Sequence, residues 1–309
     1  MPYPSDERLE ELTSRLESGI KELYASGKYA EYLRAMSKFH RYSFGNALLI
    51  LFQCPTATRV AGYTTWKREL GRNVKRHEKG IQILAPCPSK RYVWQEVTDP
   101  KTGKVLCNPD GSPRKETQLV TITRFKVATV FDVSQTEGKE LPTLGVTRLT
   151  GDVENFAAIY DKLVSLSPVP VEVDTCPGEA NGYFSSTENR IVLRPGMSQI
   201  QTVKTLVHEI AHAKLHDAKN IPSEERKQRR EKEVEAESIA YVVCQHFGID
   251  TSEYSFGYVA GWSRGKEMDE LKSSLDLIHS TAGEIIAALE DTCMEHTPQQ
   301  NKSQHQYAR

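Results

Sequence analysis

One short motif in the chain has the residue types and spacing of a catalytic metal site. Residues 207–213 read Val-His-Glu-Ile-Ala-His-Ala and contain the pattern HExxH. Because four residues make about one helical turn, His208 and His212 lie on the same face of a helix and can bind one ion. Zinc accepts imidazole nitrogen, and Glu209 is then placed to take a proton from water as a general base. The motif predicts hydrolytic chemistry with one Zn²⁺ per chain.

The positions around the three fixed residues argue against a chance match. They are uncharged and small or apolar: Val207, Ile210, Ala211 and Ala213. This composition is typical of a buried helix, in which two histidines and a glutamate need a partner to replace lost hydration. A metal ion would be such a partner.

A catalytic zinc needs a third protein ligand, and here helical phase narrows the choice. The metzincin position for a third histidine, six residues after His212, is Ala218. The next helical segment holds four glutamates: Glu231, Glu233, Glu235 and Glu237. At about 100° per residue, Glu233 falls within the apolar stripe of that segment and Glu237 at its edge. We expect one of these two to bind the metal and the other to contact a ligand histidine. Glu231 and Glu235 fall on the opposite side and are expected to be solvated.

Three further residues are candidates for substrate binding. His216 lies one turn beyond the motif, where it either lines the cleft or is exposed on the surface. Gly182 and Tyr183 precede a predicted strand at 190–193, and peptidases often pair a strand edge with an extended substrate. Gly182 would allow a close backbone approach. An ordinary hairpin is the alternative interpretation of this segment.

The periodicity of apolar residues predicts the elements that position these candidates. Helical spacing runs through about 5–52, followed by β-favouring runs at 81–85, 91–97 and 118–133 with turn signals at 99–103 and 108–111. Further along, helices are expected at 153–165, 199–217, 232–247 and 266–290, with strands at 169–173 and 190–193. The predicted fold is α+β: an N-terminal helix-plus-antiparallel-sheet domain (1–140), a linker (141–150) and a mostly helical zincin-like domain with a small sheet (151–294). The tail, 295–309, is expected to be disordered.

Composition excludes several classes of protein. Six cysteines are scattered without a CxxC pair, which argues against a cysteine zinc site. The longest apolar run, Ala47–Phe52, is too short to span a membrane. The first fifteen residues are polar and charged, unlike a secretory signal. We therefore expect a cytoplasmic bacterial protein with free thiols and no membrane partner.

Positive charge is concentrated in one segment. Nine basic and two acidic residues lie between Arg59 and Arg91, a charge of +7 in a chain of formal charge −1. Aromatic residues interleaved with cations favour single-stranded nucleic acid, whose bases stack while its phosphates are neutralised. A solvated charged face with core aromatics is the alternative. The candidate DNA-binding residues are Arg59, Tyr63, Trp66, Lys67, Arg68, Arg72, Lys75, Arg76 and Lys79.

A series of motifs in the first half resembles the N-terminal domain of the ArdC antirestriction family. The motifs are Ser43-x-x-Asn46-x-Leu48-Leu49-Ile50, Val60-x-Gly62-Tyr63-x-x-Trp66, Gly71-Arg72-x-Val74, residues 78–86 (Glu-Lys-Gly-Ile-x-Ile-Leu-Ala-Pro) and residues 130–138. The resemblance implies a domain that binds single-stranded DNA, joined to a zincin-like metallopeptidase domain, in a protein of plasmids and conjugative transposons. It adds Asn46 to the DNA-binding candidates, and the chain looks closest to LtrC-like members. One departure is His77, where many relatives carry glycine.

The second half is similar to ImmA/IrrE-type metallopeptidases, in which a later helix carries Glu-x-x-Ala followed by a polar residue and a second alanine. Residues 233–240 fit this pattern. The resemblance implies that Glu233 is the ligand and that Glu237 contacts a ligand histidine.

The favoured hypothesis is a mobile-element protein that binds single-stranded DNA and hydrolyses peptide bonds of an unknown protein substrate, in antirestriction or protection of transferred DNA. Two alternatives remain. One is a non-proteolytic antirestriction protein that binds single-stranded DNA and has a structural metal site, and the other is a peptidase that cleaves a repressor of the element.

Overall fold

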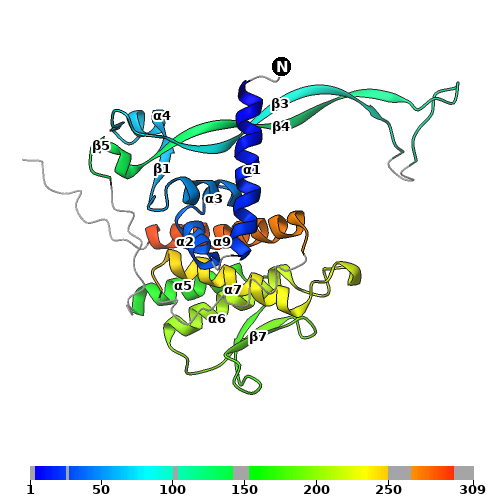
Figure 1. The fold of residues 1–309 in the computed structure, drawn as a ribbon. Coiled ribbons are helices and arrows are strands. Elements are labelled where there is room, and N and C mark those ends of the chain that lie inside the picture. The colour runs from blue at the N-terminus through cyan, green and yellow to red at the C-terminus, as the bar shows by residue number, and fades with distance from the viewer. Residues whose placement is uncertain (1–3, 26–27, 100–103, 142–152, 250–265, 296–309) are drawn as a thin grey trace, which may run out of the picture.

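The computed structural model describes residues 4–25, 28–99, 104–141, 153–249 and 266–295. Figure 1 shows three levels: a long β-hairpin, a middle level of helices, and a lower group of helices with a small sheet. The helical and strand segments confirm the predicted α+β class. The predicted linker falls almost entirely outside the described residues, as does the tail apart from residue 295.

The N-terminal helices form by burial of regularly spaced apolar residues. They are α1 (Pro4–Ala25), α2 (Tyr29–Lys38) and α3 (Phe44–Gln53). The predicted stripe of α1 is buried, with Leu12, Ile20 and Leu23 at most 2% exposed. Ser43 begins α3 as an N-cap, because its side chain accepts a hydrogen bond from the Asn46 backbone.

Beyond α3, a three-stranded antiparallel sheet carries the hairpin. Its strand order is β1 (Val60–Gly62), β4 (Lys115–Asp132) and β3 (Ile81–Glu96). The β-runs predicted as separate pieces at 81–85 and 91–97 are thus one strand, paired without interruption to β4. A helical turn, α4 (Tyr63–Arg68), and a second pair of strands, β2 (Arg72–Val74) and β5 (Thr136–Gly138), flank this sheet.

Asp132 closes the N-terminal sheet region at the end of β4. Its carboxylate accepts hydrogen bonds from the backbone of Thr58 at 2.8 Å and Arg59 at 3.0 Å, and from the backbone and hydroxyl of Ser134 at 3.0 and 2.6 Å. It thereby caps the short 3₁₀ turn η1 (Val133–Gln135) and joins it to the chain before β1.

The second half builds a helical layer on a small mixed sheet. The helices are α5 (Val153–Leu166), α6 (Gln199–Leu215) and α7 (Arg229–His246), with a 3₁₀ turn η2 (Ser223–Glu225) before α7. The sheet has the order β6 (Val171–Val173), β8 (Arg190–Leu193) and β7 (Gly182–Ser185), so β7 has one free edge. The predicted helices at 153–165, 199–217 and 232–247 are confirmed to within three residues at each end.

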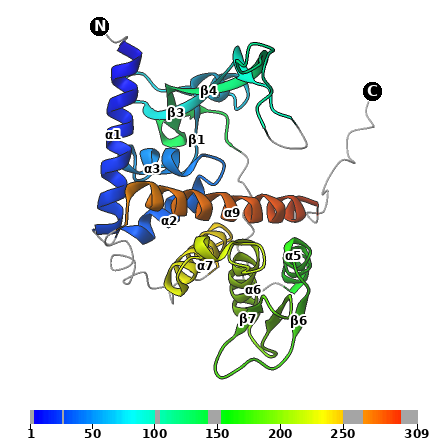
Figure 2. The same ribbon diagram turned by 90° about the vertical axis from the view of Figure 1, so that its right-hand side faces the viewer.

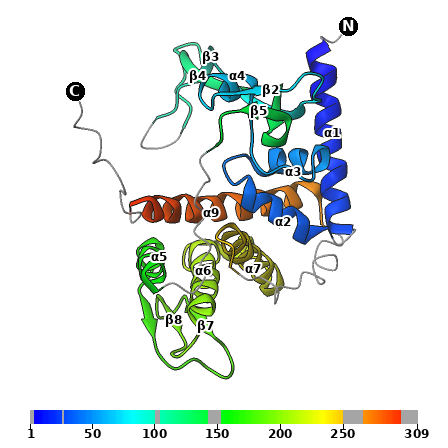
Figure 3. The same ribbon diagram turned by 90° about the vertical axis from the view of Figure 1, so that its left-hand side faces the viewer.

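The last described helix, α9 (Met268–Glu295), lies between the two halves. Figures 2 and 3 show it crossing the molecule with α3 and the hairpin on one side and α5, α6 and α7 on the other. One continuous core contains buried residues of α1, α2, α7 and α9. Direct contacts include the Tyr29 hydroxyl with the Ser238 hydroxyl at 3.0 Å and Arg34 Nε donating to the Tyr241 hydroxyl at 3.1 Å. The proposed 1–140 and 151–294 ranges therefore share a core, and their independence as domains stays a prediction.

Within the ranges that the structure describes, none of the helices combines the length and apolar character required to cross a bilayer.

Candidate metal centre and exposed hairpin face

Helix α6 positions the HExxH residues. Ser198 caps its start by accepting a hydrogen bond from the Gln201 backbone at 3.2 Å. The apolar face that the sequence predicts is buried: Leu206, Val207, Ile210 and Ala211 have no exposed surface. His208 and His212 lie on another face of α6, which is directed toward α7, the helix that packs alongside it.

Three side-chain atoms converge between α6 and α7. His208 Nε2 lies 3.1 Å from His212 Nε2, and Glu233 Oε2 lies 3.6 and 3.8 Å from these two atoms. Four donors bound tetrahedrally at about 2.05 Å are separated by about 3.3 Å, so this set fits a single metal ion. The structure thus brings together the two predicted histidines and the glutamate that the resemblance selects.

Outer partners fix the ring orientation of both histidines. The Nδ1 atom of His208 lies 3.2 Å from Glu237 Oε2, and it must carry the proton because a carboxylate only accepts. The Nε2 atom of His208 is then a lone pair directed at the shared point. Glu237 therefore occupies the supporting position expected for it.

His212 is held by a longer chain of contacts. Glu235 Oε2 lies 3.0 Å from His216 Nε2, and His216 Nδ1 lies 3.0 Å from His212 Nδ1. If Glu235 accepts from His216, then His216 accepts from His212, and the lone pair of His212 is left on Nε2. This assignment of tautomers follows from the network, and it directs both ligand nitrogens to the same place.

The sequence-based expectation that Glu231 and Glu235 are solvated is wrong. Glu235 is not solvated but fully buried, and it also contacts Lys227 and accepts from Ser274 at 2.8 Å. Glu231 is only 14% exposed in its side chain and contacts Lys266. Helical phase failed because α9 covers the side of α7 that the apolar stripe alone predicts to be open. His216 is likewise buried rather than exposed, and its partners on both sides are protein groups.

The charges of the centre shift its pKa values in opposite directions. Burial lowers the pKa of His208, but the carboxylates of Glu233 and Glu237 outweigh it and raise that pKa to about 9. The hydrogen bonds of both histidines hold the pKa of Glu233 far below its usual range. Without a metal these shifts pair a charged His208 with the two carboxylates, and a bound cation would take the place of that proton.

Glu209 lies beside this centre but outside the ligand set. It is 7% exposed, and burial raises its pKa against the lowering effect of the two histidines. The nearby backbone N–H of Phe184 in β7 also lowers that pKa. The predicted general base is therefore held between the histidine helix and the edge strand.

The edge strand gives a different account of Gly182. A Cβ at this position would lie 2.7 Å from Thr205 Cγ2 and 3.0 Å from the Val192 carbonyl oxygen. Glycine is thus required for β7 to pack on α6, and the close approach is to the protein's own helix. Tyr183 is half-buried in the same strand, and its role in substrate binding stays a prediction.

Several predicted DNA-binding residues have structural roles instead. Trp66 is fully buried and donates to the Phe131 carbonyl at 2.9 Å, so it cannot stack on a base. Asn46 is 7% exposed and pairs with both backbone groups of Leu84. The guanidinium of Arg72 joins β2 to β5 through Thr136 and Lys139. Composition alone could not separate these residues from a binding surface.

The other basic candidates remain at the surface. Tyr63 is 52% exposed, Arg59 is half-buried, and the remaining members are exposed: Lys67, Arg68, Lys75, Arg76 and Lys79. His77, in the same region, has a φ of 66°, in the left-handed region that favours glycine. This conformation explains physically why a glycine suits that position.

The hairpin presents an aromatic face that the sequence analysis did not identify as one surface. Tyr92 and Trp94 are each 73% exposed, and Phe125 is 53% exposed. Side chains alternate along a strand, and Tyr92 pairs with Leu119 while Pro86 pairs with Phe125, so all lie on one face. Lys90 shares this face. The sequence signal that could have predicted this face is the spacing of its residues by two along each strand, because side chains two residues apart lie on the same face of a sheet.

The fold and the centre define an α+β protein that joins a hairpin-bearing N-terminal region to a helical region with a histidine–glutamate metal centre. Residues 5–131 match the model of the N-terminal domain of anti-restriction factor ArdC, and residues 176–254 match that of the IrrE N-terminal-like domain of peptidase family M78. The chain thus combines an ArdC-type domain with an IrrE-like domain, as its motifs predicted. Membership of an LtrC-like subgroup stays a prediction.

Individual relatives extend these matches. An uncharacterized protein of Bacillus anthracis, pXO2-81, is 29% identical over 338 residues, an alignment covering 97% of this chain. The chain spans about half of that relative, 54% of its length. The antirestriction protein ArdC of plasmid R388 is similar in its metal-free structure (19% identity, TM-score 0.46) and its Mn(II)-bound structure (18%, 0.45). These cover 82% of this chain and 86% and 85% of theirs.

Proposed function

We propose that the protein binds single-stranded DNA and hydrolyses peptide bonds at a zinc site held by His208, His212 and Glu233. The observation that carries this proposal is the convergence of two imidazole nitrogens and one carboxylate oxygen beside the buried Glu209. The ArdC-type and IrrE-like domains support it. The biological setting that we propose is antirestriction or protection of transferred DNA in the bacterial cytoplasm.

The chain's own groups suit peptide hydrolysis. A bound zinc ion polarises a carbonyl and makes water reactive near neutral pH. Glu209 takes the proton of the attacking water and delivers it to the leaving amine. Burial raises the pKa of Glu209, which makes it a better base than an exposed carboxylate. Strand β7 is an edge strand of its sheet and lies near Glu209, so we propose that it aligns an extended substrate.

Single-stranded DNA suits the N-terminal surface. Exposed aromatics on one hairpin face provide stacking platforms, while exposed lysines and arginines of the 59–91 segment neutralise phosphates. Both features belong to the N-terminal region: β3 and β4 carry the aromatics, and the exposed basic residues lie on α4 and between β2 and β3. The buried candidates, Trp66 and Asn46, are excluded from this surface.

The peptidase is tested with the zinc-loaded full chain and a quenched fluorescent peptide library, using Glu209→Gln and the exposed control Glu10→Gln. We expect cleavage by wild type and the control, and loss of cleavage in Glu209→Gln at unchanged metal content. Equal cleavage by all three proteins would reject Glu209 as the base. If no protein cleaves, yet wild type and Glu209→Gln protect single-stranded DNA equally, the non-proteolytic alternative is correct.

A further inference from the structure

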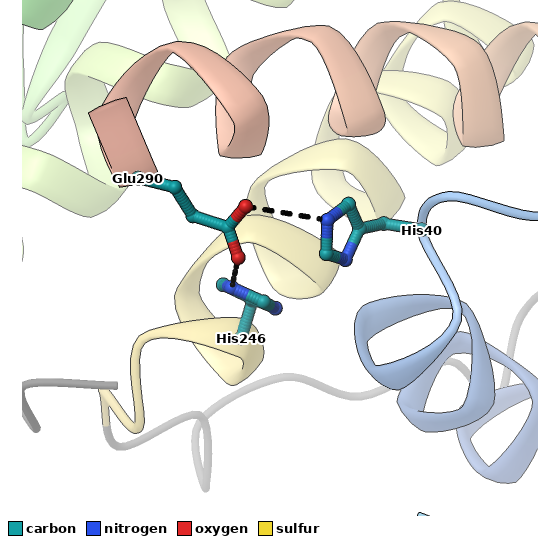
Figure 4. A group of neighbouring side chains, drawn as sticks. All are labelled: His40, His246 and Glu290. Carbon is teal, nitrogen blue, oxygen red and sulfur yellow. Dashed lines mark hydrogen bonds and ion pairs between the residues drawn. The ribbon is translucent and has the colours of Figure 1, made fainter. Parts of the chain in front are cut away.

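A second histidine–carboxylate cluster lies at the junction of the two halves and shares none of its residues with the first. Figure 4 shows His40, His246 and Glu290 facing one another. His40 lies in the turn between α2 and α3, His246 is the last residue of α7, and Glu290 belongs to α9. Their potential ligand atoms all lie within 4.8 Å of one another. Among the described residues, this is one of two such groups.

The orientation of His246 leaves a lone pair directed at a carboxylate. Its Nδ1 lies 2.7 Å from the Ser37 carbonyl oxygen, which accepts only, so Nδ1 carries a proton. In the neutral ring Nε2 is then unprotonated, yet it lies 3.1 Å from Glu290 Oε1. A lone pair and a carboxylate repel at this distance unless a cation lies between them. A backbone carbonyl bound to Nδ1 is also a common outer partner of a metal-binding histidine.

His40 lacks hydrogen-bond partners to a greater extent than His246. Its side chain is 9% exposed, and neither ring nitrogen has a hydrogen-bond partner. The nearest carboxylate atom, Glu290 Oε2, is 3.6 Å from Nε2, beyond hydrogen-bonding distance. A buried ring that satisfies neither nitrogen costs free energy, and that cost is removed if Nε2 binds an ion shared with Glu290.

The carboxylate has one further partner. Arg41 Nη2 lies 3.0 Å from Glu290 Oε2, but the arginine side chain is 73% exposed. This ion pair reaches the cluster from the solvent side and provides no acceptor or donor for His40. It compensates part of the charge of Glu290 but leaves both ring nitrogens of His40 without a hydrogen-bond partner.

We propose that His40, His246 and Glu290 form a second metal site, for a divalent transition ion of the zinc class, that ties the N-terminal turn to α7 and α9. Two imidazoles and a carboxylate are the donor set that zinc accepts, with water completing the coordination. The two histidine side chains are only 9% exposed, so the site is closed to a substrate, as structural metal sites are. The role is therefore structural: the ion joins three segments, the first of which lies about two hundred residues before the other two.

The test removes the first centre so that the second can be counted alone. In a His208→Ala/His212→Ala full chain, we expect about one zinc per chain by elemental analysis and a d–d absorption band after Co²⁺ loading. Adding Glu290→Gln, which preserves the side-chain shape, should reduce metal affinity beyond the roughly 10–100-fold effect of losing an outer partner. His246→Gln and His40→Gln should act similarly.

The matched control is His279→Gln, a buried histidine on the same helix that contacts the Tyr42 carbonyl and lies outside the cluster. It should retain one zinc per chain. Far-UV circular dichroism establishes whether each variant is folded. If a histidine variant is unfolded, the metal affinity of Glu290→Gln decides the test. The proposal is overturned if the folded His208→Ala/His212→Ala chain binds no zinc, or if Glu290→Gln and both histidine variants keep full stoichiometry. In either case, protonated histidines hold the junction together.

Discussion

The two histidine–carboxylate clusters differ in how the chain assembles them and in how open they are. The first takes both histidines from one helical turn, and its Glu233 side chain is 47% exposed. The second takes each residue from a different segment, and its two histidines are 9% exposed. A reacting site must admit a substrate, whereas a structural site is closed. The difference agrees with the catalytic role proposed for the first cluster and the structural role proposed for the second.

The largest expected effect tests the chemical role of the open cluster. Glu209→Gln should lower the peptide hydrolysis rate by about 10²–10⁴-fold, the contribution of a positioned general base. Glu290→Gln should leave the rate constant for hydrolysis unchanged in chains that remain folded. Equal losses in both variants, measured as kcat on one cleaved peptide, would contradict the contrast between the clusters.

A second prediction concerns the contacts behind the open cluster. His216→Gln removes the imidazole that orients His212, so metal affinity should fall by about 10–100-fold. Competition with a chelator of known affinity measures this change. Because Glu10 is exposed and lies in α1, distant in sequence from the ligands, Glu10→Gln is the control. Unchanged affinity in His216→Gln would mean that His212 is oriented by its own packing.

A third prediction separates DNA binding by the exposed hairpin from metal binding by the two histidine–carboxylate clusters. Tyr92→Ala/Trp94→Ala should weaken single-stranded DNA binding by about 1–3 kcal/mol for each base stacked. Metal content should not change. Fluorescence anisotropy with a labelled oligonucleotide provides the measurement, and Trp66→Phe, in the core, is a control for loss of folding. Full affinity in the double variant would move the DNA site to the basic segment.

The smallest expected effect uses a buried carboxylate that has no histidine partner. Burial raises the pKa of Asp132, but hydrogen bonds from Ser134, Thr58 and Arg59 outweigh it, and the net shift is downward. A lowered folded-state pKa stabilises the fold above the unfolded value of about 3.9, and this stability is lost as pH falls further. Asp132→Asn should cost about 1–3 kcal/mol at pH 7. The deficit, followed by urea unfolding, should shrink below about pH 4; a constant deficit would contradict the assigned cause.

The open cluster was predictable because its information is local. His208, Glu209 and His212 share one helical turn, and a single helix offers Glu233 and Glu237 at related angles. The contact of His216 with His212 and the burial of Glu235 were not predicted, because Glu235 is covered by α9, whose Ser274 lies about forty residues further along the chain. His40, His246 and Glu290 have no spacing that a sequence pattern can reveal. Their proximity exists only once three distant segments fold together.

The same limit applies to the N-terminal half. The strands of the hairpin were predictable from β-favouring residues, whereas the fate of each aromatic was not. Trp66 and Trp94 both lie near basic residues in sequence, yet one is fully buried and the other 73% exposed. The difference arises because the short α4 turn folds back on the sheet, while Trp94 lies in the outer part of the hairpin, where β3 and β4 pair with each other.

The shared core limits how the two halves of the chain can be exchanged between related proteins. Tyr29 and Arg34 of α2 contact Ser238 and Tyr241 of α7, and α9 buries residues on both of its sides. A chain cut near residue 141 would leave apolar positions of α7 and α9 in water. The halves are therefore not interchangeable modules. We expect recombination between relatives to give a folded chain only where α1, α2, α7 and α9 come from the same relative. Substitutions in these four helices should therefore be correlated during evolution.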